Sequence, residues 1–141
     1  MGWHTKSSTS PFTRELLIEH GGFIYDSNAY NDDIPYVVKK KDQKFVIIPY
    51  SFDTNDMRFD ANNGFVRGDD FNIYCKESFN QLLLETKDGS PRMMSIGLHP
   101  RIIGKPGRIK GLEDFIKYIK TFKNVWIPKR MDIAKYCLEK D

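Results

Sequence analysis

The eight residues 93–100, Met-Met-Ser-Ile-Gly-Leu-His-Pro, form a short and mostly apolar run that stops at a histidine followed by a proline. An apolar run of this length, bounded by turn-forming residues, is typical of a buried strand. Pro100 has no backbone N–H and restricts the residue before it to an extended conformation. The pattern therefore predicts a buried strand that stops at His99, with His99 itself extended.

The end of such a strand is a place where chemistry can occur. In open α/β sheets and α/β barrels, active sites lie at the carboxyl ends of the strands. A neutral imidazole there can accept or donate a proton near pH 7. A histidine that only hydrogen-bonds its own loop fits the same position, so the neighbouring residues must decide between the two interpretations.

Length and composition limit the class of protein. The chain has 141 residues, of which 40% are hydrophobic and 29% are charged, as in one soluble domain over residues 1–141. No apolar run approaches the roughly 20 residues that span a bilayer, and the first residues lack the apolar core of a signal peptide. Cys75 and Cys137 lack metal-type spacing. We therefore expect a cytoplasmic protein with two reduced thiols and no membrane partner.

The net charge of +3 is unevenly distributed along the chain. Residues 101–141 hold 11 basic and 5 acidic side chains. The lysines in this part are spaced as on the solvated face of a helix, and neither an RNA-binding signature nor zinc-finger spacing is present. We expect no nucleic-acid partner.

The rest of the chain alternates apolar strands with amphipathic helices. Helices are predicted from Ser10-Pro11 to Gly21-Gly22, from Asp69-Asp70 to about residue 86, after Gly107, and at the carboxyl end around residues 133–138. Short strands are predicted at 23–25, 36–38, 45–48 and 125–127, with an exposed turn at 39–43. This order favours a mostly parallel sheet, and the helix that opens the chain suggests an exposed sheet edge.

Three polar loops follow three of these predicted strands. They carry Asp26 with Asp32 and Asp33, Asp53 with Asp56 and Arg58, and His99 with Arg101. Parallel strands would place all three loops at one edge of the sheet, as an acid/base and anion-binding group. Aspartate is also common in loops because it caps turns, so each aspartate alone also has a structural interpretation.

Other candidate sites lack the spacing that their chemistry requires. Gly104-Lys105-Pro106-Gly107 has neither Walker nor dinucleotide spacing, and we interpret it as a turn. The three histidines, at positions 4, 20 and 99, show no paired metal-binding spacing. We predict no metal ligands and no cofactor within this chain.

Several motifs, in order along the chain, resemble the polysaccharide deacetylase (NodB-homology) superfamily. The first are Gly2-Trp3-His4-Thr5, Ser10-Pro11-Phe12-Thr13-Arg14, residues 19–27 and residues 31–36. Pro49-Tyr50, residues 53–59, Gly97-Leu98-His99-Pro100-Arg101, residues 104–108 and residues 125–134 resemble the branch of metal-independent allantoinases and their deacetylase relatives. The resemblance covers essentially the whole chain.

This resemblance implies the C-terminal half of a distorted (β/α) barrel, with mostly parallel strands alternating with helices, that hydrolyses C–N amide bonds. It implies that His99 is the general acid towards the leaving nitrogen and that the segment from Asp26 to Asp33 supports it. The implied small-molecule substrate is a ureide, the hydantoin ring of allantoin in purine catabolism. The alternative is an N-acetylated sugar polymer such as chitin, in carbohydrate metabolism.

Two departures from the family pattern leave two interpretations open. Family members are much longer, and their N-terminal half carries the catalytic aspartate base and the metal motif. Lys6-Ser7-Ser8 also stand where many relatives have glycine and arginine. We therefore expect either half of a hydrolase, with Asp26, Asp33 and Arg58 lining its pocket, that pairs with a separate N-terminal half. The alternative is a truncated, non-catalytic homologue that self-associates as a homo-oligomer.

Overall fold

The computed structural model describes residues 1–6 and 8–141, and these residues divide into two compact units. Unit 1 comprises Met1–Tyr50 and Ile127–Asp141, and unit 2 comprises Ser51–Trp126. The departure from the family pattern at Ser7 lies outside the described residues. The single domain over residues 1–141 stays a prediction.

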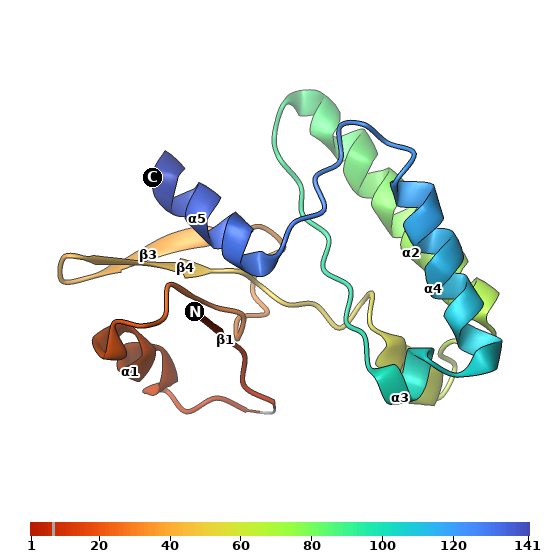
Figure 1. The fold of residues 1–141 in the computed structure, drawn as a ribbon, viewed down its shortest axis with the longest axis horizontal. Helices are drawn as coiled ribbons and strands as arrows, with labels where there is room; N and C mark the ends of the chain where they lie inside the picture. The colour runs from red at the N-terminus through yellow and green to blue at the C-terminus, as the bar shows by residue number, and fades with distance from the viewer. Residues whose placement is uncertain (7) are drawn as a thin grey trace. The chain divides into compact units, whose positions relative to one another are not determined.

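Unit 1 is built on a sheet whose described strands have the order β1-β2-β4-β3 (Figure 1). The strands are β1 (Gly2–Trp3), β2 (Tyr25–Asp26), β3 (Tyr36–Lys40) and β4 (Gln43–Ile47). β1, β2 and β4 are parallel, whereas β3 and β4 form an antiparallel hairpin. The predicted α/β fold with a mostly parallel sheet is confirmed.

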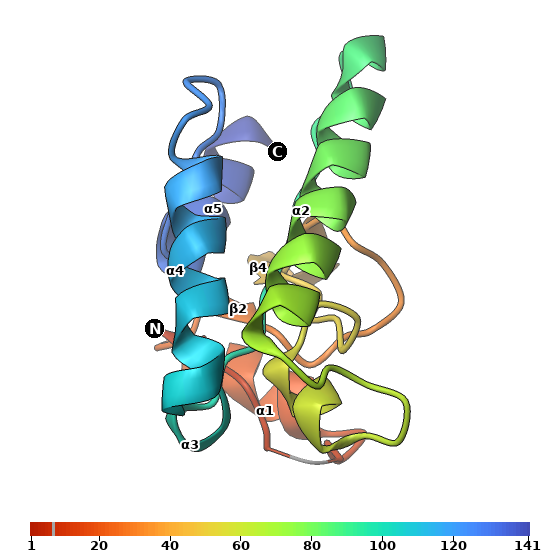
Figure 2. The same ribbon diagram turned by 90° about the vertical axis from the view of Figure 1, so that its right-hand side faces the viewer.

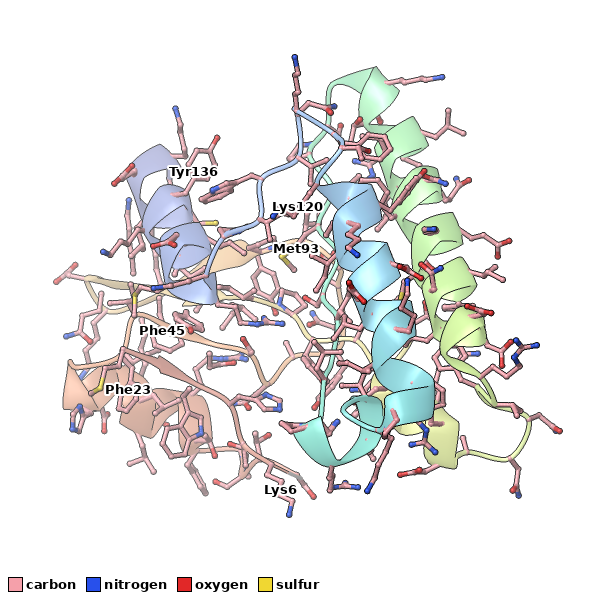
Figure 3. The ribbon with its side chains drawn as sticks, turned by 45° about the vertical axis from the view of Figure 1, so that its right-hand side comes forward. Lys6, Phe23, Phe45, Met93, Lys120 and Tyr136 are labelled. Carbon is pink, nitrogen blue, oxygen red and sulfur yellow. The ribbon has the colours of Figure 1, made fainter. Side chains whose placement is uncertain are left out.

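Two helices cover the two faces of this sheet. Figure 1 shows α1 (Thr13–His20) on one face and α5 (Arg130–Lys140) on the other. Leu17 and Ile18 of α1 bury their side chains against Phe45 and Ile47 of β4. Phe23 packs against the same cluster, and Figure 3 labels it together with Phe45. Alternate residues of β4 thus form the apolar core beneath α1.

The first helix begins later than predicted but ends as predicted. The Ser10 hydroxyl accepts the N–H of Phe12 at 3.0 Å, which closes a turn ahead of the helix. The helix therefore starts at Thr13 instead of at Ser10-Pro11. Gly21 ends it with a left-handed φ of 72°, a conformation that glycine adopts without steric cost.

Unit 2 is mainly helical. It contains the 3-10 helices η1 (Asp56–Asp60) and η2 (Thr86–Asp88) and the helices α2 (Gly68–Glu85), α3 (Pro100–Ile103) and α4 (Pro106–Ile119). Figure 2 shows α2 and α4 side by side. A side chain at Gly111 of α4 would meet the carbonyl oxygen of Gly68 at 2.0 Å, so this close approach requires glycine. The buried core of the unit is Phe59, Phe65, Phe71, Cys75, Phe79, Ile102, Ile103 and Phe115.

Two predicted strands are wrong. The apolar run at 93–98 forms only a single parallel bridge, between Gly97 and Asn55. The ladder stops there because the partner segment turns into η1 at Asp56. Residues 125–127 are also not a strand, and Trp126 and Ile127 are exposed. An apolar run supplies the side chains of a strand, but a strand also needs a neighbour for its backbone.

Two other predicted elements are displaced. The strand predicted at 23–25 is β2, at Tyr25–Asp26. The predicted exposed turn at 39–43 is shorter, because Lys39 pairs with Lys44 and Lys40 pairs with Gln43 in the β3–β4 hairpin. Over the described residues, no helix has the length and apolar character needed to traverse a bilayer.

Candidate functional site

The candidate site in unit 2 is a carboxylate–imidazole pair formed by Asp56 and His99. The Asp56 side chain is fully buried, and its Oδ1 lies 2.6 Å from the Nδ1 atom of His99. Its Oδ2 accepts the backbone N–H of His99 at 2.6 Å and the N–H of Ile103 at 3.2 Å. The two carboxylate oxygens therefore hold both the ring of His99 and the start of α3.

Backbone hydrogen bonds bring this pair together across 43 residues of sequence. Asp56 donates its N–H to the carbonyl of Gly97 at 3.0 Å, and Gly97 donates to the carbonyl of Thr54 at 3.1 Å. The Thr54 hydroxyl donates to the carbonyl of Ser95 at 2.5 Å, and Asn55 caps η1 by accepting the N–H of Met57 at 2.8 Å. The single bridge that replaces the predicted strand thus fixes the distance between the two loops.

His99 is positioned so that only one ring nitrogen is committed. It is extended, with φ −121° and ψ 116°, as the proline at position 100 predicts, and that conformation is confirmed. An ionised carboxylate only accepts, so the hydrogen between Asp56 and His99 belongs to Nδ1. Nε2 makes no hydrogen bond among the described residues of unit 2, and the His99 side chain is 35% exposed. Such a ring can exchange a proton with a bound molecule through Nε2.

The other predicted site residues of unit 2 lie around this pair with different contacts. Asp53 accepts the hydroxyl of Tyr74 at 2.6 Å, and Nη1 of Arg58 donates to the carbonyl of Asp53 at 3.1 Å. Arg101 is exposed in α3, and its Nη1 lies 3.9 Å from a carboxylate oxygen of Asp60. Their roles in binding stay predictions.

Asp26 ends β2 in unit 1, where it is fully buried and paired with Arg14. Arg14 donates from Nε to Oδ2 at 2.7 Å and from Nη2 to Oδ1 at 3.3 Å. The N–H of Asn28 adds a third hydrogen bond at 3.0 Å. The hydrogen bond with Asp26 raises the pKa of Arg14, so this pair is a stable ion pair and not a proton-exchanging one.

The remaining predicted aspartates, Asp32 and Asp33, form a local turn in unit 1. Oδ1 of Asp32 accepts the N–H of Asp33 at 2.7 Å and the N–H of Ile34 at 3.3 Å. Both aspartates are exposed. This is the turn-capping arrangement for which aspartate is common in loops.

Sequence reasoning missed a polar cluster around Ser27 in unit 1. The carbonyl of Ser27 accepts Nδ1–H of His4 at 2.8 Å, and its hydroxyl accepts Nη1–H of Arg130 at 2.9 Å. Arg130 also donates to the carbonyls of Ile48 and Pro49 at 3.2 and 3.4 Å, and burial lowers its pKa. Arg14 and Arg130 occur in helical patterns where arginine is usually a surface residue, so no sequence signal indicated that they bind the buried Asp26 and Ser27.

Few of the described side chains are candidates for metal binding or redox chemistry. Over residues 1–6 and 8–141, no three His, Cys, Asp or Glu side chains are grouped so that they could hold a metal ion. Cys75 and Cys137 are both free thiols. Burial raises the pKa of Cys75 to about 12, which keeps this thiol protonated and unreactive at neutral pH.

Comparison with known proteins gives relatives that cover most of this chain. No protein-family model matches the sequence. A curated protein of Schizosaccharomyces pombe (strain 972 / ATCC 24843) named "Putative polysaccharide deacetylase" is 38% identical over 120 residues, which are 79% of this chain and 38% of that protein. The chain therefore spans well under half the length of this relative.

Solved structures are also similar to this chain over most of its length. The crystal structure of PuuE allantoinase matches with a TM-score of 0.86 and 46% identity, over 95% of this chain and 44% of that one. A "probable polysaccharide deacetylase" from Pseudomonas aeruginosa PAO1 matches with a TM-score of 0.86 and 46% identity, over 95% and 45%. A structure from Mycobacterium smegmatis, 24% identical with a TM-score of 0.79 over 94% and 47%, supports the fold alone. The resemblance predicted from the sequence is confirmed.

Proposed function

We propose that this polysaccharide deacetylase-like chain supplies the proton donor of a hydrolase that cleaves C–N amide bonds. The observation behind the proposal is the Asp56–His99 pair, in which a fully buried carboxylate holds one ring nitrogen while the other makes no hydrogen bond within the described part of unit 2. In the hydrolysis, water adds to the carbonyl carbon and the C–N bond breaks. As the C–N bond breaks, the imidazolium form of His99, which carries a proton on each ring nitrogen, gives its Nε2 proton to the leaving nitrogen and keeps the one on Nδ1 that faces Asp56.

The second proton transfer needs a base that removes a proton from the attacking water. Asp26 is a poor choice, because both of its oxygens accept hydrogen bonds from Arg14. The chain spans 44% and 45% of two solved relatives. We propose that the base comes from the part of the fold that those relatives have and this chain does not span.

We propose a ureide as the substrate, with an N-acetylated sugar polymer as the alternative. The allantoinase and the probable deacetylase are equally similar to this chain, at 46% identity, so similarity does not separate the two substrates. Hydrolysis of a ureide would place the chain in purine catabolism. Its two free cysteines fit a reducing compartment such as the cytoplasm.

The test combines this chain with the part of PuuE allantoinase that it does not cover, either mixed or fused, with and without added divalent metal. Allantoin and N-acetylglucosamine oligomers are assayed as substrates. We expect His99→Gln to lower kcat by about 10²–10⁴-fold. His20→Gln, at an exposed histidine of α1, is the matched control and should leave kcat unchanged. Equal activities of the His99→Gln and parent proteins would refute the proton-donor role.

A second proposal is that the chain is a non-catalytic partner that associates through the β1 edge. β1 is two residues long, pairs in parallel with β2 and lies at the edge of the described sheet. Proteins normally cover the exposed edge of a parallel sheet. Light scattering over a range of concentrations tests this. A monodisperse monomer with two-state unfolding would contradict self-association.

A further inference from the structure

We infer that Asp53, Arg58 and Tyr74 of unit 2 form a clamp that positions Asp56 and, through it, the ring of His99. We call these three residues the Asp53 clamp. The inference rests on the proposed function, because it concerns the geometry of the proposed proton donor. It gives Asp53 and Arg58, which the sequence analysis placed only in a polar loop near the site, a specific positioning role, and it adds Tyr74, which neither the sequence nor the comparisons assign.

Asp53 is held by two different side chains. The Tyr74 hydroxyl, from α2, donates to Oδ1 of Asp53 at 2.6 Å. Nη1 of Arg58, from η1, donates to the backbone carbonyl of Asp53 at 3.1 Å and lies 3.6 Å from Oδ1. Both the backbone and the carboxylate of this one residue are therefore fixed.

Arg58 is itself held tightly. Its guanidinium carbon lies 4.2 Å from the ring centre of Tyr74 and 4.7 Å from that of Phe65, so the planar group contacts two aromatic rings. Its carbonyl accepts the N–H of Phe65 at 2.9 Å, and Phe65 belongs to the buried core of unit 2. The position of Arg58 is thus set by the core and not by the loop alone.

Residues 53 and 58 enclose the short segment that carries Asp56. Because the clamp joins the two ends of this segment, residues 54–57 have little freedom to shift. The Asp56 carboxylate accepts three hydrogen bonds at 2.6 to 3.2 Å, from the backbone N–H and Nδ1 of His99 and from the N–H of Ile103. A displacement of a fraction of an ångström would lengthen these hydrogen bonds and reorient the ring.

Stability alone is a weak reason for this arrangement. The Asp53 side chain is 57% exposed, and exposed ion pairs contribute little to folding. The clamp should therefore affect the orientation of the Asp56–His99 pair more than the stability of unit 2.

The test uses the full 141-residue chain, isotopically labelled, and follows His99 by NMR. Tyr74→Phe removes one hydroxyl and keeps the ring that stacks on Arg58. We expect the Nδ1 proton of His99 to exchange with water about tenfold faster, because the pair opens more often. In the combined enzyme, kcat should fall about fivefold with KM unchanged, as expected when only alignment is lost.

The matched control is Tyr118→Phe. The Tyr118 hydroxyl donates to Oδ1 of Asn80 at 2.8 Å, also across unit 2 and also at the surface, but it does not touch the segment around Asp56. It should leave the His99 signals unchanged. Arg58→Gln provides a second variant, and it should change the His99 signals in the same direction as Tyr74→Phe.

The outcomes separate the clamp from the proposed function. Unchanged His99 exchange in both Tyr74→Phe and Arg58→Gln would overturn the clamp, whatever their melting temperatures. The NMR measurement needs no substrate, so it is valid even if the enzyme assay fails. Altered exchange together with full activity of His99→Gln would support the clamp and refute the proton-donor role.

Discussion

Each unit buries one carboxylate next to a basic side chain, and the two pairs differ in what the partner can do. Asp26 in unit 1 and Asp56 in unit 2 are both fully buried. Asp26 binds the guanidinium of Arg14 through both oxygens, whereas Asp56 binds the imidazole of His99 and two backbone N–H groups. Burial of an aspartate therefore does not distinguish a structural role from a chemical one. Its partner does.

The difference follows from the chemistry of the two partners. A guanidinium keeps its proton at every accessible pH, so the Arg14–Asp26 pair can only hold parts of unit 1 together. An imidazole gains and loses a proton near neutral pH, and its second nitrogen stays available when the first is bound. The Asp56–His99 pair thus combines a fixed orientation with a titratable group.

The largest effect is expected from Asp56→Asn in the combined enzyme. An amide cannot reproduce a carboxylate that accepts hydrogen bonds on both oxygens, so the ring of His99 loses its fixed tautomer. We expect kcat to fall about 10³–10⁴-fold, as when the carboxylate of a catalytic triad is replaced by an amide. Urea unfolding should show a loss of about 1–3 kcal/mol, because charge-assisted hydrogen bonds are removed. Retention of kcat within tenfold would contradict the positioning role of Asp56.

Asp26→Asn should show the opposite balance. It breaks an ion pair whose aspartate is buried and whose arginine side chain is 39% exposed, so we expect a loss of about 1–2 kcal/mol in urea unfolding. Activity of the combined enzyme, corrected for the folded fraction, should stay within about threefold of the parent. A fall in kcat as large as that of Asp56→Asn would place Asp26 in the catalytic group and remove the contrast between the two units.

The sequence predicted the local features of the site better than its long-range contacts. Pro100 sets the extended conformation of His99 through its own ring, so this conformation could be predicted from two residues. The helical spacing of apolar residues likewise predicted α2 and α4. Asp56 was one of several similar loop aspartates. Its selection as the partner of His99 depends on the bridge between Asn55 and Gly97, which no local pattern encodes.

The wrong strand at 93–98 has a related physical cause. Met94 and Ile96 pack against the core of unit 2, so the run is apolar whether or not a neighbouring strand is present. An apolar pattern indicates that a segment is buried. A strand also needs a neighbouring backbone with which to form hydrogen bonds. Arg14 shows the converse error, since the partner of the buried Asp26 lies in a helix whose pattern alone gives no sign of this ion pair.

The last prediction concerns the two free thiols, one in each unit, and it bears on stability alone. Burial raises the pKa of Cys75 from 9.0 to about 12, so the folded thiol stays protonated at a pH where the unfolded thiol ionises. The protonated Cys75 thiol therefore contributes its full share of the free energy of unfolding below about pH 9. Above that pH the free energy of unfolding should fall by about 1.4 kcal/mol per pH unit. Urea unfolding between about pH 8 and pH 11 measures this slope.

Cys75→Ala should flatten this slope relative to the parent, although the cavity that the substitution leaves lowers the free energy of unfolding at every pH. Cys137→Ala, at a half-buried thiol in α5, is the control and should retain most of the slope. Equal slopes in the parent and in Cys75→Ala would show that ionisation of the Cys75 thiol is not linked to unfolding of unit 2.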